Sequence, residues 1–291
     1  MAVPYPGARR VKRKNVGLLA ATFVASPVLA GIVYSALAAV HLAGPARSGL
    51  STDSIRVVLA DRVTWSGLGF TVWVAAASTL LACLLAMGLA FLFRGHNRLD
   101  RLARVLAIAP LPLPHAVAAL CGVLILSQSG VLARMAAAVH LASSPQAMPA
   151  LIYDRWGIGL ILALTWKEVP FLALLAFSAL ATSGNLLEEA ARSLGAGPLA
   201  TFRRAIFPAL WRGMLPGVVA VFTFVAGNYE AAALLAPSAP LAFPLLTIER
   251  YRDSALSVRA DAYALVLIAA FISISVIALH EWIVAQTEAL T

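Results

Sequence analysis

Long runs without a single Asp, Glu, Lys or Arg dominate this sequence. Residues 15–46, 63–93 and 105–133 form three such runs, and residues 262–280 form another. A helix needs about 20 mostly apolar residues to cross the hydrocarbon core of a bilayer. Each of the first three runs exceeds that length, and the last one nearly equals it. The runs therefore predict an all-α, polytopic membrane protein.

Two further apolar runs are interrupted by charged residues. Residues 156–187 contain only Lys167 and Glu168, and the run that starts after Arg212 is interrupted by Glu230. With these two included, the sequence predicts about six transmembrane helices.

The charge composition agrees with a surface that faces lipid. Only 12% of the 291 residues are charged, whereas a typical soluble domain has about 25%. The net charge of +9 could indicate nucleic-acid binding. However, the basic residues gather in three short segments, at 9–14, 94–104 and 192–212. Such clusters mark the cytoplasmic loops of a multispanning protein.

With six spans, both chain termini lie on the same side of the membrane. The three basic segments precede the first span and follow the second and fourth, and they hold thirteen of the 22 Lys and Arg residues. We therefore predict that both termini are cytoplasmic. A cleaved signal peptide is an alternative, because residues 36–38 (ALA) resemble a cleavage site. The apolar run 16–40 exceeds the roughly 7–15 residues of a signal core, which favours an uncleaved first helix.

The most informative stretch covers residues 185–208, between the fourth and fifth runs, and reads NLLEEAARSLGAGPLATFRRAIFP. Asn185 and Glu188 fit a variant of the capping box that starts a helix. Gly195 suits the left-handed residue that ends this helix, and Pro198 suits the first turn of a second one. The pattern predicts a helix–turn–helix that is too short and too polar to span a membrane.

This loop resembles the cytoplasmic signature of permease subunits of binding-protein-dependent ABC importers. The signature is Glu-Ala-Ala, three residues, Gly, nine residues, Ile, one residue and Leu-Pro. The chain matches it at Glu189, Ala190, Ala191, Gly195 and Pro208. Two positions depart from it, since Ala205 stands at the Ile position and Phe207 at the Leu position, with Ile206 supplying bulk between them.

By this resemblance, the fold is that of a type I ABC importer permease in a single transmembrane domain. Residues 1–63 would form a basic tail, a first helix and an outer loop, and residues 64–286 a five-helix core. The 185–208 loop would be the coupling helix that docks on a separate ATPase. The implied coupling residues are Glu188, Glu189, Ala190, Ala191, Arg192, Gly195, Ala205, Phe207 and Pro208.

The resemblance also implies the partners. Two nucleotide-binding ATPase subunits would carry ATP and Mg, and a second permease chain, by analogy non-identical, would complete the pore. An external binding protein would deliver a small solute, and the complex would lie in the bacterial inner membrane. Residues 111–114 (LPLP), 168–171 (EVPF) and 227–230 (GNYE) look like permeases for polyamines, thiamine, ferric iron and oxyanions. They do not identify one solute.

Polar residues within the fourth and fifth apolar runs mark a candidate translocation path or gate. They are Lys167, Glu168, Asn228, Tyr229 and Glu230. A charge inside a bilayer is costly, so it usually faces a bundle interior or a water-filled cavity. A structural pair between helices, such as Lys167 with a carboxylate from another span, is the alternative.

Motifs for catalysis are missing from the sequence. It has no GxxxxGK[ST], HExxH or GxSxG pattern, and its two cysteines lack metal-ligand spacing. We therefore expect no catalytic residue, metal or cofactor on this chain. A secondary transporter driven by an ion gradient is the alternative function, but it would leave the Glu-Ala-Ala loop unexplained. A membrane-embedded enzyme would need a recognisable nucleophile or metal set.

Overall fold

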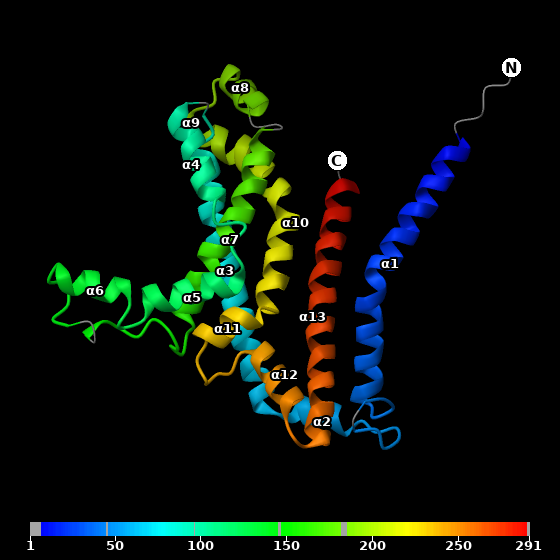
Figure 1. The fold of residues 1–291 in the computed structure, drawn as a ribbon. Helices are drawn as coiled ribbons and strands as arrows, with labels where there is room; N and C mark the ends of the chain where they lie inside the picture. Colours follow the sequence, from blue (N-terminus) through cyan, green and yellow to red (C-terminus); the bar gives the residue numbers. More distant parts are fainter. Residues whose placement is uncertain (1–6, 45, 96, 145–146, 182–184, 290–291) are drawn as a thin grey trace. The chain divides into compact units, whose positions relative to one another are not determined.

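A computed structural model describes residues 7–44, 46–95, 97–144, 147–181 and 185–289. Side chains are described for all of these except residues 7–16, 18, 185–187 and 287–289. The described part of the chain is mostly helical and contains no strand (Figure 1). The predicted all-α fold is confirmed.

Long helices alternate with short ones along the chain. The long helices are α1 (Gly7–Ala39), α3 (Arg62–Leu92), α7 (Ile158–Ala179), α10 (Phe207–Ala226) and α13 (Leu256–Ala289). The shorter helices are α2 (Asp53–Ala60), α4 (Arg98–Ile108), α5 (His115–Leu126), α6 (Val131–Ala138), α8 (Asn185–Ser193), α9 (Pro198–Thr201), α11 (Tyr229–Leu235) and α12 (Phe243–Arg252). A π-helical turn, η3 (Phe202–Ile206), joins α9 to α10.

Six described segments are long and apolar enough to cross a membrane. They are Leu19–Ala39, Arg62–Leu92, His115–Ala138, Ile158–Ala179, Pro198–Ala226 and Leu256–Gln286. By length and composition, the number of these segments matches the predicted six spans.

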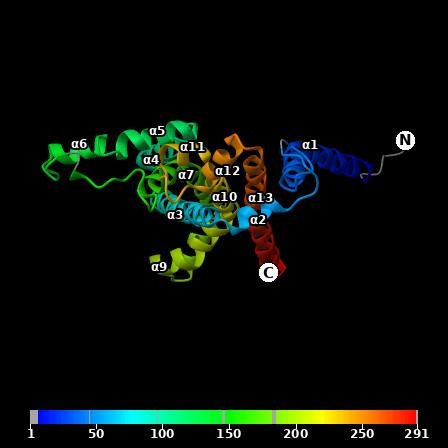
Figure 2. The same ribbon diagram turned by 90° about the horizontal axis from the view of Figure 1, so that it is seen from below.

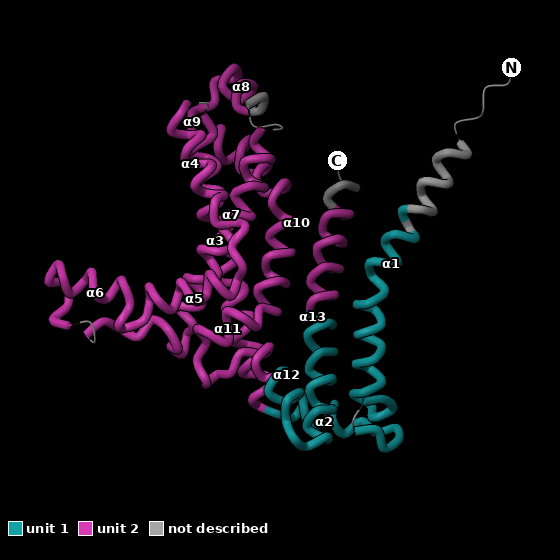
Figure 3. Tube along the Cα trace, in the orientation of Figure 1, with its two compact units in different colours: residues 1–61, 247–272 teal, residues 62–246, 273–291 magenta. Residues whose placement is uncertain are grey.

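The chain divides into two compact units (Figure 3). The first unit comprises residues 1–61 and 247–272, and the second comprises residues 62–246 and 273–291. The second unit contains the predicted coupling loop and all of the predicted path residues.

Aromatic and ionic contacts hold the first unit together. The rings of Tyr34 and Tyr263 meet edge-on, with centroids 5.7 Å apart. Arg250 binds two carboxylates, Asp61 at 2.8 Å and Asp261 at 3.3 Å. One guanidinium therefore joins α12 to the end of α2 and to α13, because its fork of N–H donors serves two acceptors at once.

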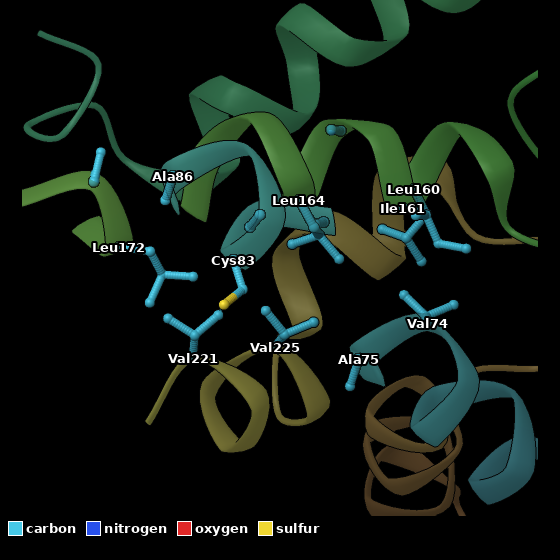
Figure 4. Packing of buried hydrophobic residues seen from close by; sticks show 14 of the residues in the cluster. Val74, Ala75, Cys83, Ala86, Leu160, Ile161, Leu164, Leu172, Val221 and Val225 are labelled. Atoms are coloured by element: carbon cyan, nitrogen blue, oxygen red, sulfur yellow. The ribbon is translucent and has the colours of Figure 1, made fainter. Parts of the chain in front are cut away.

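The core of the second unit lies between α3, α7 and α10, which run side by side (Figures 1 and 2). α3 contributes a stripe of fully buried small residues at helical spacing: Ala75, Ser78, Ala82, Ala86 and Ala90. Leu164 and Leu172 of α7 and Val221 of α10 belong to the same buried cluster (Figure 4). Small residues let helices approach closely, and van der Waals packing is a main source of helix association in lipid.

The third apolar run does not form one helix. The sequence predicts a single helix within residues 105–133, but the structure ends α4 at Ile108 and begins α5 only at His115. Prolines at 110, 112 and 114 explain the break, because each lacks an N–H donor and disfavours helical backbone before it. The twelve residues of α5 span about 18 Å, less than the roughly 30 Å of a hydrocarbon core, so the candidate span His115–Ala138 also includes α6.

The fifth apolar run is also organised differently from the prediction. α10 ends at Ala226, and Asn228 caps a separate helix, α11, by accepting a hydrogen bond from the backbone N–H of Ala231 at 2.8 Å. Glu230 lies in the first turn of α11. The prediction that Glu230 lies within the fifth spanning helix is therefore wrong, and the Gly227–Asn228 pair marks the end of that helix.

Enlarging a residue of the buried α3 stripe should loosen the core. Ala82→Leu adds three carbons at a fully buried position, and overpacking of this kind costs about 1–3 kcal/mol. We expect a lower Tm for the detergent-purified chain, measured by thermal denaturation. Ala76→Leu, at an exposed position on the same helix, is the matched control. Equal Tm values for the two variants would contradict close packing along this stripe.

Candidate functional site

The predicted helix–turn–helix is present at one end of the second unit (Figure 1). α8 ends at Ser193, Gly195 has a φ of +78°, and α9 begins at Pro198. A Cβ at Gly195 would meet no atom within 4 Å, so it is the left-handed backbone that favours glycine. Both the end of the first helix and the start of the second are confirmed. The predicted capping box involves Asn185, whose side chain lies outside the described residues.

The outward surface of this turn combines charge with apolar area. Glu189, Ala190 and Arg192 are exposed on α8. Leu194 is 87% exposed and Leu199 is 77% exposed, one on each side of the Gly195 turn. Exposed leucines beside charged groups offer a protein partner both apolar area and ion pairs. The sequence prediction missed both leucines, although two large apolar residues flanking a glycine turn in a polar loop are a detectable signal.

Glu188 faces the body of the second unit. Its Oε1 accepts hydrogen bonds from Nη2 of Arg94, at 3.0 Å, and from Nη2 of Arg192. The Glu188 side chain is only 14% exposed. Arg94 lies two residues beyond the last residue of α3, so this contact ties α8 to the end of α3. Neither local pattern nor spacing could have predicted a pair separated by 94 positions.

The remaining signature residues lie around the π-helical turn η3. The N–H of Phe207 bonds to the carbonyl of Phe202, five residues back. A π turn at this place fits Pro208, which has no N–H for the carbonyl four residues earlier. Ile206 is buried, whereas Ala205 and Pro208 are half-buried and Phe207 is exposed. Ile206 is therefore the residue that anchors this segment.

A polar cluster lies midway along α7. Glu168 Oε1 is 2.9 Å from Nε2 of His115, the first residue of α5. The adjacent Lys167 donates from Nζ to the carbonyl oxygen of Leu111 at 3.2 Å. Lys167 and Glu168 are 5% and 6% exposed. The ring centroids of His115 and Phe224 are 4.6 Å apart. The expected partner for Lys167 was a carboxylate, but the structure gives it a backbone carbonyl.

The other predicted path residues lie at the turn from α10 to α11. Asn228 caps α11 and borders a small, partly open pocket with Phe70 and Leu164. Tyr229 is half-buried and Glu230 is exposed. The structure thus divides the predicted path between two places. In the part of the chain that the structure describes, no group of three or more His, Cys, Asp or Glu side chains could hold a metal ion.

Comparison with known proteins relates the chain to importers. A sequence model of the family described as "Binding-protein-dependent transport system inner membrane component" matches residues 78–288. The chain is similar to the molybdenum transport system permease protein ModB of Mycobacterium tuberculosis, with 30% identity over 77% of this chain and 80% of the relative. It is 31% identical to the sulfate transport system permease protein CysT of Synechocystis sp., over 48% of this chain and 47% of that one.

The fold has solved counterparts. One is a chain in the crystal structure of a bacterial ABC transporter involved in the import of the acidic polysaccharide alginate. The TM-score is 0.66 at 15% sequence identity, and the match covers 96% of this chain and 99% of that chain. This likeness establishes a shared fold.

The His115–Glu168 contact should show as a coupling energy in a double-mutant cycle. We expect His115→Ala and Glu168→Ala each to lower the Tm of the chain in detergent. The loss of unfolding free energy in the double variant should be smaller than the sum of the two single losses by about 0.5–3 kcal/mol, because both substitutions remove the same interaction. His115→Ala combined with Glu230→Ala, which removes an exposed carboxylate, should be additive. Additive losses for His115→Ala with Glu168→Ala would show that the pair contributes nothing.

Proposed function

Because this chain belongs to the family of binding-protein-dependent transport system inner membrane components, we propose a working assembly and a cargo for it. The chain is a permease subunit of a binding-protein-dependent ABC importer. It lines the solute path with a second, non-identical permease. Two separate ATPase subunits hold ATP and Mg²⁺, and an external binding protein delivers the solute. Hydrolysis belongs to the ATPase chains, so this subunit is not itself catalytic.

The α8–α9 turn is the surface that docks on the ATPase. The observation that supports this docking surface is a group of exposed side chains around the left-handed turn at Gly195: Glu189, Ala190, Leu194 and Leu199. Glu189 supplies charge, Ala190 permits close approach of a partner helix, and the leucines supply apolar area. Movement of the ATPases on binding ATP displaces this turn, and the permease rocks between inward-open and outward-open states.

The mid-span cluster holds the gate rather than the cargo. Lys167 and Glu168 are buried and contact Leu111, within the break between α4 and α5, and His115, the residue that ends it. They therefore fix an irregular segment against α7, where a shift would open or close the path. Asn228, Tyr229 and Glu230 border the path at the opposite end of the unit from the α8–α9 turn (Figure 1).

The cargo is a small oxyanion of the molybdate and sulfate class. This assignment is supported by the relatives, which are named for molybdenum and sulfate transport.

The complex lies in a bacterial inner membrane with both termini of this chain in the cytoplasm. In support, the α3–α4 connection and the α8–α9 turn lie at the same end of the second unit (Figure 1), and arginines cluster in the segments around both, at 94–104 and 192–212. Like-sided basic loops are typical of the cytoplasmic face.

A pair of substitutions at Gly195 tests the docking turn through its backbone alone. Gly195→Val forces a β-branched residue into left-handed backbone, at a cost of about 1–3 kcal/mol. Gly195→Asn should be tolerated, because asparagine adopts this conformation readily. We expect the Val variant to insert normally but to lose co-purification with the ATPase and ATP-dependent uptake, while the Asn variant keeps both. Parental uptake by Gly195→Val would remove this turn from the coupling mechanism.

The cargo can be measured directly in proteoliposomes that contain both permeases, the ATPases and the binding protein. We expect uptake of labelled molybdate or sulfate that requires ATP and is unaffected when ion gradients are collapsed. Uptake that follows an ion gradient without ATP would instead identify a secondary transporter. ATP-driven uptake of a non-anionic solute alone would refute the oxyanion assignment and leave the importer function intact.

A further inference from the structure

Two neighbouring side chains join the end of α3 to both arms of the docking turn. Arg94 binds Glu188 of α8 through Nη2 and Oε1, which are 3.0 Å apart. The ring of Phe91 meets the ring of Phe202 in η3 edge-on, with centroids 4.7 Å apart and planes at 70°. α3 therefore holds α8 by an ion pair and η3 by an aromatic pair.

The guanidinium of Arg94 is fixed by contacts within its own segment. Its Nη1 donates to the carbonyl oxygen of Phe91 at 3.0 Å, and its central carbon lies 4.3 Å from the centroid of the Phe91 ring. These two contacts orient the planar fork before it meets Glu188, so little conformational freedom remains to be lost. A lysine at this position would keep the charge but would provide neither the fork nor the stacking.

Burial distinguishes this pair from an ordinary surface ion pair. The side chains of Arg94 and Glu188 are 31% and 14% exposed, whereas that of Arg192, the second partner of Glu188, is 68% exposed. Exposed pairs at i, i+4 spacing contribute little because water screens them. Charge-assisted hydrogen bonds that are partly shielded from water are stronger. Of the two ion pairs that Glu188 forms, the pair with Arg94 is therefore the stronger.

We propose that Arg94 is a positioning residue that transmits displacement of α8 to α3 through Glu188. This role depends on the proposed docking of α8 on the ATPase. The chain itself connects α8 to α7 on one side and, through α9 and η3, to α10 on the other. Arg94 adds a connection to α3, which packs against both α7 and α10. With Arg94 in place, α3 is tied directly to α8; without it, displacement of α8 reaches α3 only indirectly, through α7, α10 and the Phe91–Phe202 contact.

Charge reversal at Arg94 separates this role from docking. Arg94→Glu sets two carboxylates against each other but leaves the outward surface of α8 unchanged. In the reconstituted complex we expect ATP-dependent uptake to fall about tenfold. The ATPase should still co-purify and should keep its basal hydrolysis rate. Arg98→Glu changes an exposed arginine of the same connection and should retain parental uptake.

Exchanging the two charges tests whether uptake depends on the ion pair itself, because recovery of uptake would not be expected if Arg94 had only a structural role. In Arg94→Glu/Glu188→Arg, the two charges of the pair are exchanged, so a carboxylate just beyond the end of α3 faces a guanidinium on α8. We expect uptake to recover to more than half of the parental rate. Parental uptake by Arg94→Glu, or a double variant no better than either single one, would overturn the role of Arg94. If the parental chain failed to bind the ATPase at all, the docking itself would be refuted.

Discussion

Lipid offers no hydrogen bonds to the backbone, and the interior of this protein is organised around that constraint. An unsatisfied peptide group in hydrocarbon costs several kcal/mol, so each crossing must be helical or find substitute partners. The break between α4 and α5 is not helical, so its backbone groups need other hydrogen-bond partners. Its local turns recover some bonds, such as that from the N–H of Leu111 to the carbonyl of Ile108. Lys167 then donates to the carbonyl of Leu111 itself. A buried lysine that the sequence marked as part of a translocation path or gate thus hydrogen-bonds to the backbone.

Glu168 extends this logic to the other end of the break. Adjacent helical residues point about 100° apart, so Lys167 and Glu168 diverge and reach separate targets. Lys167 contacts Leu111, and Glu168 contacts His115 at the start of α5. Two consecutive side chains of α7 therefore hold the irregular segment itself, at Leu111, and the start of the next helix, at His115. Such an irregular segment can exist at membrane depth only where protein buries it or where it lines a water-filled cavity.

Features encoded by single residues were predictable from the sequence, whereas contacts between distant segments were not. The left-handed Gly195 and the helix start at Pro198 follow from backbone chemistry and were found where expected. The helix break at residues 109–114 was missed because the run was judged by its lack of charge, although its three prolines carried the signal. Likewise, Gly227 and Asn228 already marked the end of α10 ahead of Glu230. By contrast, the partners of Arg94 and His115 lie 94 and 53 positions away, and they depend on which helices pack together.

The two adjacent carboxylates of α8 illustrate why the structure changes the interpretation of the signature. In the sequence, Glu188 fits a capping box and Glu189 begins the Glu-Ala-Ala signature, and both are assigned to the predicted coupling loop. In the structure, a rotation of about 100° per residue turns Glu188 inward to Arg94 and leaves Glu189 exposed. One carboxylate therefore anchors the helix to its own subunit, and the other is left for a partner. A short helix between two spans needs both, because a docking surface without an internal anchor would shift under load instead of moving the core. If the proposed docking holds, the force from the ATPase would enter α3 at Glu188, the position next to the Glu-Ala-Ala pattern.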